Sequence, residues 1–415
     1  MIRKNAPYIL ILAGETRAAL ACVRSLGRKE EKIVVAAESF GSLASFSRFT
    51  STSVISPPPA AGVDKFINWL NSFLRNNPGC KLIIPCSDWS VLACASWRER
   101  LSRTELNDES SDFAEKPSIA IPTLEQIKVV HDKLEFAQRC RLQNFDTPAT
   151  RLLTATEAHE IPLPAVVKAR FSASENNSKK VSVKYLKNKT ALIRLAHDTP
   201  PDTLVVQTQL QGTAYGVSAL FWNGRFVSDF CHRRLLEKPP SGGVSALAEA
   251  VAQQDTPGHE ACIALLRSLK WHGLAMVEIK CDADQKPYLL EINPRPWGTI
   301  QLAISAGRDF PGMILQLCSA KTGEKIDDLI KEIKRLPNYN TKVRLRWTLG
   351  TLDHALIRLK NEGIKGACSC LFKNSLLLHS QTHQTISDTF SPSDPGPFIL
   401  ETAAWIWQAL GGAEK

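Results

Sequence analysis

The chain has 415 residues, of which 44% are hydrophobic and 22% charged, and its net charge is +10. At roughly 150 residues per domain, this length predicts two or three packed units, and the composition excludes a disordered or fibrous chain. The sequence has no run of 18 or more apolar residues that would predict a membrane-spanning helix. The apolar run near the first two basic residues is at the short limit for a secretory signal and no clean cleavage site follows it, so we expect a buried first strand.

The eleven cysteines are scattered and include no CxxC pair at metal-binding spacing. We expect reduced, mostly buried thiols and a cytoplasmic location. Cys368 and Cys370 are the closest pair, but they lack a second pair of ligands and therefore predict no metal site.

The basic residues are spread along the chain, and their one dense run, 179–189, lacks the interleaved aromatic residues of a nucleic-acid surface. An anionic small substrate accounts for the charge equally well. We therefore expect neither a nucleic-acid partner nor a membrane.

The first hundred residues alternate between apolar runs and amphipathic patterns. We predict buried parallel strands at 8–13, 32–37 and 81–87, and helices at 15–29, 63–77 and 90–101. This alternation is typical of a doubly wound α/β sheet. Gly14 lacks the GxGxxG context of a dinucleotide site, so it predicts a tight turn with a helix N-terminus directed at a crevice.

The middle third has a β-rich pattern that predicts an α+β region with an antiparallel sheet. A short strand at 118–122 is followed by a single helical stretch at 123–143, and the further strands are expected at 164–170, 181–187, 203–210 and 215–230. Asn223-Gly224 predicts a hairpin turn within the last of them. Beyond residue 320, a helix at 323–336 precedes a smaller mixed region.

Residues 273–298, GLAMVEIKCDADQKPYLLEINPRPWG, form two strand patterns joined by the polar turn ADQK. A turn centred there sets Glu278 opposite Glu291, with Cβ atoms about 4.5–5.5 Å apart, where like charges repel. Alternation adds Asn293 to this face, so two carboxylates and an amide oxygen predict a Mg²⁺ site. The opposite, core-packed face is expected to hold Val277, Ile279, Leu290 and Ile292.

Arg295 lies between two prolines, which restrict the backbone around it. We expect it to stabilise charge on a transferring phosphoryl group or to bind a substrate carboxylate. Residues 232–245, HRRLLEKPPSGGVS, predict an anion-binding patch beside a flexible clamp, with Arg234 as its anchor, although a plain surface loop fits the same residues. Trp271 and Trp297 are expected to pack in the core.

These motifs resemble the ATP-grasp superfamily, which includes carbamoyl phosphate synthetase large subunits, biotin carboxylase and D-alanine:D-alanine ligase. The segment EINPRPWG, with V-E on the facing strand, resembles the metal-binding strands of these enzymes. Asp132-Lys133 followed by FDTPA resembles the start of their central domain, and PAVVK, which ends at Lys168, resembles the strand whose lysine contacts the phosphates. Residues 204–210, LVVQTQL, resemble the segment whose backbone reads the adenine edge.

The resemblance implies a Rossmann-like pre-ATP-grasp domain at 1–117 and a two-lobed ATP-grasp domain at 118–320. Within the latter, the nucleotide lid lobe would occupy about 145–210 and the metal-binding lobe about 211–320. Residues 321–415 would form a mixed α/β extension.

The resemblance also implies roles for individual residues. Those that would bind the nucleotide are Lys133, Lys168, Gln207, Thr208, Leu210, Glu278 and Glu291, with Leu210 as a backbone donor. The ligands of Mg²⁺, or of Mn²⁺ in its place, would be Glu278, Glu291 and Asn293. The groups that would act in catalysis are Lys168, Arg234 and Arg295.

The activity implied is that of an ATP-dependent ligase, in which a carboxylate is activated as an acylphosphate and an amine then displaces phosphate. A carboxylase-type enzyme that uses bicarbonate is an alternative. A non-catalytic ATP-binding regulatory module is another, because the lid loop at 172–180 contains no glycine and would rely on Ser172, Ser174 or its lysines. The expected partners are a small carboxylate and an amine, and a homodimer is compatible with the sequence.

Overall fold

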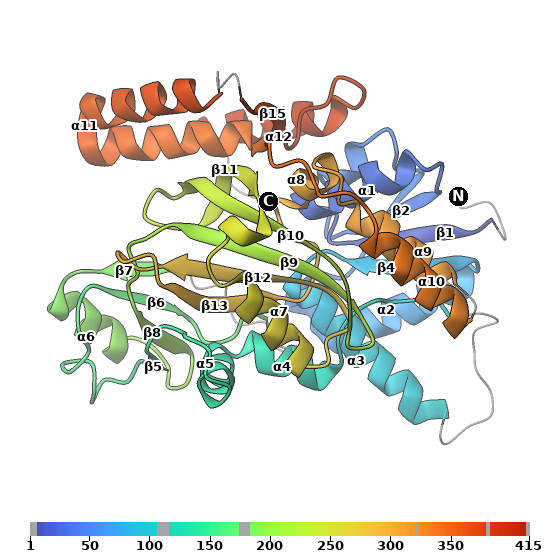
Figure 1. The fold of residues 1–415 in the computed structure, drawn as a ribbon, viewed down its shortest axis with the longest axis horizontal. Coiled ribbons are helices and arrows are strands. Elements are labelled where there is room, and N and C mark those ends of the chain that lie inside the picture. Colours follow the sequence, from blue (N-terminus) through green and yellow to red (C-terminus); the bar gives the residue numbers. More distant parts are fainter. Residues whose placement is uncertain (1–5, 106–115, 174–182, 321, 379–381, 412–415) are drawn as a thin grey trace.

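A computed structural model describes residues 6–105, 116–173, 183–320, 322–378 and 382–411, but not the side chains of residues 103–105 and 365–378. Ser174 and most of the lid loop therefore lie outside the described residues, and so do the side chains of Cys368 and Cys370. Figure 1 shows a parallel sheet at one end of the molecule, a long antiparallel sheet through its middle and a small sheet at the other end.

The N-terminal unit is a four-stranded parallel sheet in the order β3-β2-β1-β4. Its strands are β1 (Tyr8–Leu12), β2 (Ile33–Ala37), β3 (Thr52–Ile55) and β4 (Cys80–Pro85), and its helices are α1 (Arg17–Gly27), α2 (Val63–Asn76) and α3 (Asp88–Glu105). Ile9 and Ile11 pack on the face covered by α1, whereas Leu10 and Leu12 pack on the face of α2 and α3. The predicted doubly wound arrangement is confirmed.

The predicted helix at 123–143 is wrong in one respect, because it is two helices, α4 (Leu124–His131) and α5 (Lys133–Leu142). Asp132 adopts an extended conformation between them, and its carboxylate caps α5 by accepting from the N–H groups of Leu134 and Glu135. The expected strand at 118–122 is also absent. Among the described residues, Ser118 makes only a single parallel bridge with Leu82.

The small sheet is antiparallel, in the order β5-β8-β6-β7. It consists of β5 (Thr150–Leu152), β6 (Ala165–Ala169), β7 (Lys184–Leu186) and β8 (Leu204–Thr208), and α6 (Lys189–His197) packs on it. The expected strands at 164–170, 181–187 and 203–210 correspond to β6, β7 and β8.

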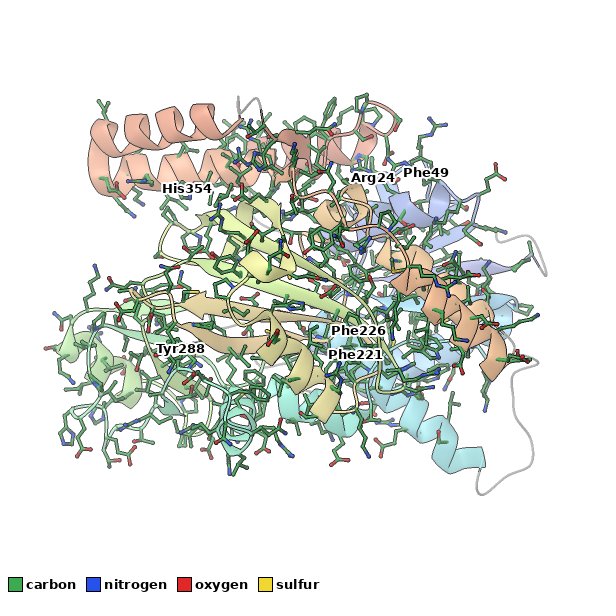
Figure 2. All side chains as sticks on the ribbon, in the orientation of Figure 1. Arg24, Phe49, Phe221, Phe226, Tyr288 and His354 are labelled. Atoms are coloured by element: carbon green, nitrogen blue, oxygen red, sulfur yellow. The ribbon has the colours of Figure 1, made fainter. Side chains whose placement is uncertain are left out.

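The large sheet runs β13-β12-β9-β10-β11-β14-β15. Its first five strands are the edge strand β13 (Pro287–Asn293), followed by β12 (Gly273–Cys281), β9 (Ala214–Trp222), β10 (Arg225–Lys238) and β11 (Val244–Val251). The Asn223-Gly224 hairpin is confirmed, and Phe221 and Phe226 pack edge to face beside it, with ring centroids 5.7 Å apart (Figure 2). Trp271 and Trp297 are fully buried, as predicted.

Helices cover both faces of the large sheet. On one face, α7 (His259–Ser268) shares a core with β9 and β12. On the other, α8 (Ile300–Ser305), α9 (Phe310–Ser319) and α10 (Gly323–Lys334) share a core with α1. The large sheet and the N-terminal unit therefore bury one continuous apolar surface.

The C-terminal residues complete the large sheet. β14 (Val343–Arg346) pairs with β11, and β15 (Gln384–Ser387) adds the last strand. Between them, α11 (Thr348–Leu378) is broken at Gly363, where φ is 70°, and its two arms run antiparallel (Figure 1). α12 (Gly396–Ala409) ends the described chain. The large sheet thus continues past residue 320, the predicted end of the ATP-grasp domain. The domain limits at 117 and 320 remain predictions.

No helix in the described part of the chain has the length and hydropathy needed to cross a bilayer.

Candidate functional site

A cavity of about 460 Å³ lies where the small sheet, the large sheet and the N-terminal unit meet. Ten residues predicted from the sequence line it: Lys133, Lys168, Gln207, Thr208, Leu210, Arg234, Glu278, Glu291, Asn293 and Arg295. They come from β6, β8, β10, β12, β13, the start of α5 and the turns beyond β8 and β13. The structure therefore brings together every residue predicted for the site, while their roles remain to be tested.

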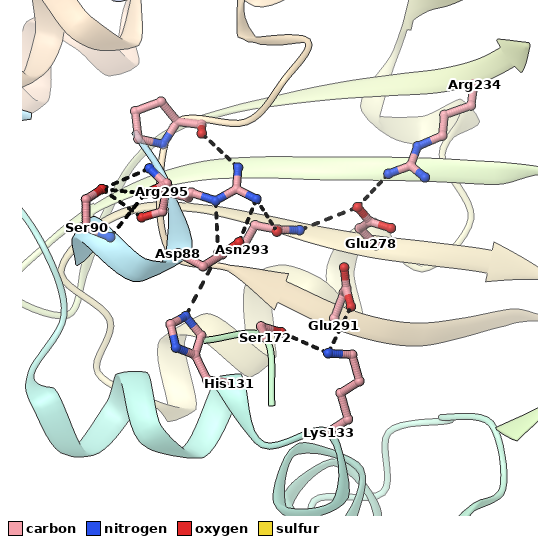
Figure 3. Close-up of polar contacts among 12 residues, drawn as sticks. Asp88, Ser90, His131, Lys133, Ser172, Arg234, Glu278, Glu291, Asn293 and Arg295 are labelled. Atoms are coloured by element: carbon pink, nitrogen blue, oxygen red, sulfur yellow. Dashed lines mark hydrogen bonds and ion pairs between the residues drawn. The ribbon is translucent and has the colours of Figure 1, made fainter. Parts of the chain in front are cut away.

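The two predicted metal-binding strands pair as expected, with Glu278 directly opposite Glu291 (Figure 3). The predicted position of Leu290 is wrong. A register shift after Glu278 pairs Ile279 with Leu289, so that Leu290 is the extra residue of a bulge. Leu289 consequently packs in the core and Leu290 lines the cavity.

The bulge makes two adjacent leucines a matched pair for a test. Leu290→Ala is expected to weaken nucleotide binding by about 5- to 20-fold, since apolar surface facing the base is lost. Leu289→Ala is expected to lower the free energy of unfolding by about 2–5 kcal/mol and to leave the affinity of the folded protein unchanged. Isothermal titration with ADP measures the affinity, and urea unfolding measures the stability. A loss of affinity in Leu289→Ala together with a loss of stability in Leu290→Ala would show that strict strand alternation holds.

The two facing carboxylates have different electrostatic surroundings. Burial raises the pKa of Glu278 above its ordinary value, although Arg234, with Nη2 2.6 Å from Oε1, works in the opposite direction. Burial also opposes ionisation of Glu291, but the charges of Lys133 and Lys168 outweigh it and hold the pKa of Glu291 below its ordinary value. Glu291 is thus the more firmly ionised of the pair.

Asn293 and Arg295 are tied to the N-terminal unit through Asp88, at the start of α3. Arg295 donates to both carboxylate oxygens of Asp88, at 2.9 Å each, and to the side-chain oxygen of Asn293 at 3.0 Å (Figure 3). Nη1 of Arg295 donates to the carbonyl of Pro296. Since these four contacts occupy most of the five N–H donors, the geometry favours Arg295 as a group that positions Asn293.

Lys133 and Lys168 form the basic wall facing Glu291. The helix break at Asp132 places Lys133 at the first position of α5, where its Nζ lies 2.9 Å from Ser172 Oγ and 4.0 Å from Glu291 Oε2. Burial lowers the pKa of Lys133, and Glu291 counteracts this effect. Lys168 lies in β6, and its side chain makes no ion pair or hydrogen bond within the described ranges, so its charge is available to an anionic ligand.

The β8 end of the cavity has the groups needed to bind a purine edge. Gln207 donates from its side-chain amide to Thr150 Oγ1 at 3.0 Å, which leaves its amide oxygen as an acceptor. Thr208 ends β8, and the N–H of Leu210 has no acceptor among the described residues. The apolar side chains of Pro148, Val166 and Leu290 line the same cavity.

Sequence reasoning missed three cavity residues that lie outside the predicted motifs, Arg17, Asp88 and Thr299. Asp88 follows the carboxyl end of a parallel strand, which is where ligands bind in open α/β sheets, so this position was a usable signal. Arg17 carries no comparable signal, because only the fold brings it to the site. His232 and Gly298, which also line the cavity, lie within the predicted segments 232–245 and 273–298, but neither was singled out.

The donor set fits a hard divalent cation. Two facing carboxylates and an amide oxygen are ligands that Mg²⁺ accepts, and such a cation would offset the repulsion between Glu278 and Glu291. No group of three or more His, Cys, Asp or Glu side chains in the described part of the chain is arranged to hold a metal. The predicted metal site does not require such a group, because its third ligand is the side-chain amide of Asn293.

The parallel sheet, the small antiparallel sheet and the large sheet enclose one charged cavity. Residues 200–339 of the chain match the family described as ATP-grasp in the biosynthetic pathway with Ter operon. No curated protein matches the chain in sequence.

Three solved structures illustrate the shared fold. L-amino acid ligase from Bacillus licheniformis has a TM-score of 0.58 at 14% identity, over 78% of this chain and 77% of that one. Biotin carboxylase from Campylobacter jejuni has a TM-score of 0.56 at 13% identity, over 82% and 74%. The biotin carboxylase domain dimer of Hydrogenobacter thermophilus 2-oxoglutarate carboxylase, in complex with MgADP and bicarbonate, has a TM-score of 0.50 at 13% identity, over 72% and 69%.

Proposed function

We propose that the protein is an ATP-dependent carboxylate-amine ligase that forms an acylphosphate intermediate. The observation that carries the proposal is the pair of facing carboxylates, Glu278 and Glu291, in a cavity whose other charged groups are mostly cationic. Six lysines and arginines line this cavity with four aspartates and glutamates. This excess of positive charge suits a polyphosphate and an acid substrate.

The nucleotide would lie along the cavity from β8 to β13. The adenine amino group would donate to the side-chain oxygen of Gln207, and the N–H of Leu210 would donate to a ring nitrogen, while Leu290 packs against the base. The phosphates would then reach Lys133 and Lys168, whose charges face Glu291.

Glu278, Glu291 and Asn293 would hold Mg²⁺, which when bound supplies charge neutralisation at the terminal phosphates. The carboxylate oxygen of the acid attacks the γ-phosphorus as the bond to the ADP oxygen breaks, and the amine then attacks the acyl carbon with loss of phosphate. Lys133, Lys168 and Arg234 stabilise the charge of the transferring group, where electrostatic stabilisation and alignment supply most of the catalysis. Arg295 keeps Asn293 in place.

A screen of ADP release tests this proposal. Purified protein is incubated with Mg·ATP and pairs drawn from amino acids, hydroxy acids and small amines, with bicarbonate as a separate arm and Glu291→Gln as the control. We expect ADP formation that depends on both an acid and an amine. Turnover that requires only bicarbonate would favour a carboxylase, and ATP binding without turnover in any arm would favour a regulatory module.

We also propose a cytoplasmic location, on the basis of the cysteines. All nine in the described part of the chain are free, and eight of them are buried. Homodimer formation remains a prediction, which sedimentation can test.

A further inference from the structure

The lining of the cavity extends beyond the predicted metal strands to His232 in β10, Arg17 in α1 and the turn after β13. Gly216 in β9 pairs with Glu278 on one side and with His232 on the other, so His232 lies two strands from Glu278, about 10 Å away at the usual strand spacing. A Cβ at Gly216 would collide with the imidazole ring of His232, which therefore lies over this glycine. Thr299 lines the cavity beside His232, and its hydroxyl lies 3.4 Å from Nε2 of His232.

Arg17, at the start of α1, lines the cavity and is held by two C-terminal residues. Its Nη1 donates to Asp388 at 2.5 Å, and its guanidinium carbon lies 4.2 Å from the ring centroid of Trp347. The Arg17 side chain is only 14% exposed. The C-terminal part of the chain thus fixes a largely buried guanidinium at the edge of the cavity.

Most hydrogen-bond donors of the Arg17 side chain have no partner among the described residues. A guanidinium has five N–H groups, and the bond to Asp388 is the one that the Arg17 side chain makes there. Gly298 has no side chain to fill the space beside Nη2, and a Cβ there would meet nothing nearer than that nitrogen, at 3.4 Å. A largely buried cation with unused donors beside open space is suited to an anionic ligand.

The neighbouring groups restrict the anion. Burial, together with the charge of Arg234, lowers the pKa of His232 to about 3, so this imidazole is neutral at physiological pH. Asp388 already balances one unit of charge at Arg17. A carboxylate, with a single negative charge and two oxygens for the planar fork, suits such a site better than a phosphate dianion.

We propose that Arg17 binds a carboxylate that does not react, carried by the acid or the amine substrate. The proposal rests on the ligase function proposed above, and it identifies the substrate class as amino acids or dicarboxylic acids rather than monocarboxylic acids and simple amines. Asp388 and Trp347 are positioning residues, because they act through Arg17.

Calorimetric titration of the Mg·ADP-bound protein tests this proposal without turnover. The probes are the twenty amino acids, succinate and glutarate, with acetate, ethylamine and inorganic phosphate as comparisons. We expect at least one amino acid or dicarboxylate to bind, and Arg17→Ala to weaken its binding by at least about 30-fold while ADP binding changes less than twofold. Arg225→Ala, at an exposed ion pair with Asp327, is the matched control and should leave both affinities unchanged.

Asp388→Asn separates ligand binding from a purely structural role. If Arg17 served only to pair with Asp388, Arg17→Ala and Asp388→Asn would change carboxylate binding in the same direction. Asparagine can still accept the hydrogen bond that positions Arg17, but it removes the negative charge that competes with the ligand, so Asp388→Asn should instead tighten carboxylate binding. The Arg17→Ala/Asp388→Asn double variant leaves no buried unpaired carboxylate and keeps the test valid if the single variant unfolds.

Equal binding of the carboxylate by wild type and Arg17→Ala, or binding of phosphate alone, would overturn the proposal. So would the absence of binding by every amino acid and dicarboxylate to protein that binds Mg·ADP. Failure to bind Mg·ADP would instead contradict the proposed function, so the two failures are distinguishable.

Discussion

Replacing Glu291 with glutamine is expected to lower ADP formation by on the order of 10²- to 10³-fold, the usual cost of losing one charged group at a phosphoryl-transfer site. Glutamine keeps the shape of the side chain but removes the negative charge that faces Glu278 and offsets Lys133 at 4.0 Å. Affinity for Mg²⁺ should fall for the same reason. Affinity for metal-free ADP should be retained or increase, because the basic wall is then less compensated.

The measurement is steady-state ADP release over a range of Mg²⁺ concentrations, with titration of ADP in the presence and absence of Mg²⁺. Glu324→Gln, on the exposed first turn of α10, is the matched control and should behave as wild type. Loss of ADP binding without Mg²⁺ in Glu291→Gln would indicate a damaged fold. Unchanged turnover in a folded variant would remove Glu291 from the proposed metal site.

Replacing Arg24 with methionine is expected to lower the free energy of unfolding by about 3–5 kcal/mol, which is typical when one partner of a buried ion pair is removed. Arg24 and Asp394 are 3% and 1% exposed, and Nε lies 2.8 Å from Oδ2. Arg24 also donates to the backbone carbonyls of Asp388 and Thr389, at 3.0 and 2.7 Å. Arg24 also donates to the backbone carbonyl of Asp394, so the substitution leaves a buried carboxylate and three carbonyls without this donor.

Urea unfolding measures this loss, and limited proteolysis should show early cleavage near α12, because its attachment to α1 is weakened. Lys331→Met removes the exposed pair with Asp328, in which the side chains are 66% and 63% exposed, and should change stability by no more than about 0.5 kcal/mol. Equal changes in the free energy of unfolding for Arg24→Met and Lys331→Met would mean that the buried Arg24–Asp394 pair contributes little to stability. Arg24→Met/Asp394→Asn should recover part of the loss.

Local sequence patterns predicted the elements that depend on neighbouring residues. Three of the four parallel strands of the N-terminal unit and the Asn223-Gly224 hairpin follow from periodicity and turn chemistry, whereas β3 was not predicted. The helix break at Asp132 was missed, although an aspartate is a strong N-cap, because the apolar pattern continues through it. β14 and β15 were missed because four-residue strands are too short for a periodic signal.

The residues of the candidate site likewise include some that local patterns predict and others that they do not. The pairing of Glu278 with Glu291 could be predicted because a short turn sets the register, but Leu290 could not, since a bulge breaks the period of two on which the prediction rests. Asp88 pairs with Arg295 across 207 positions of sequence, and Arg17 with Asp388 across 371. Contacts between residues so far apart leave no local pattern in a single sequence.

The Arg24–Asp394 pair also affects the order in which the chain can fold. The two residues are 370 positions apart, so at about 5–20 residues per second the ribosome makes Asp394 roughly 20–70 s after Arg24. Throughout that interval, α1 has a guanidinium on a surface that will later be sealed, and the apolar partners from α8 and α9 are also absent for most of it. The unit that contains α1 therefore leaves the exit tunnel long before it can be completed, and native packing around α1 must await the synthesis of Asp394.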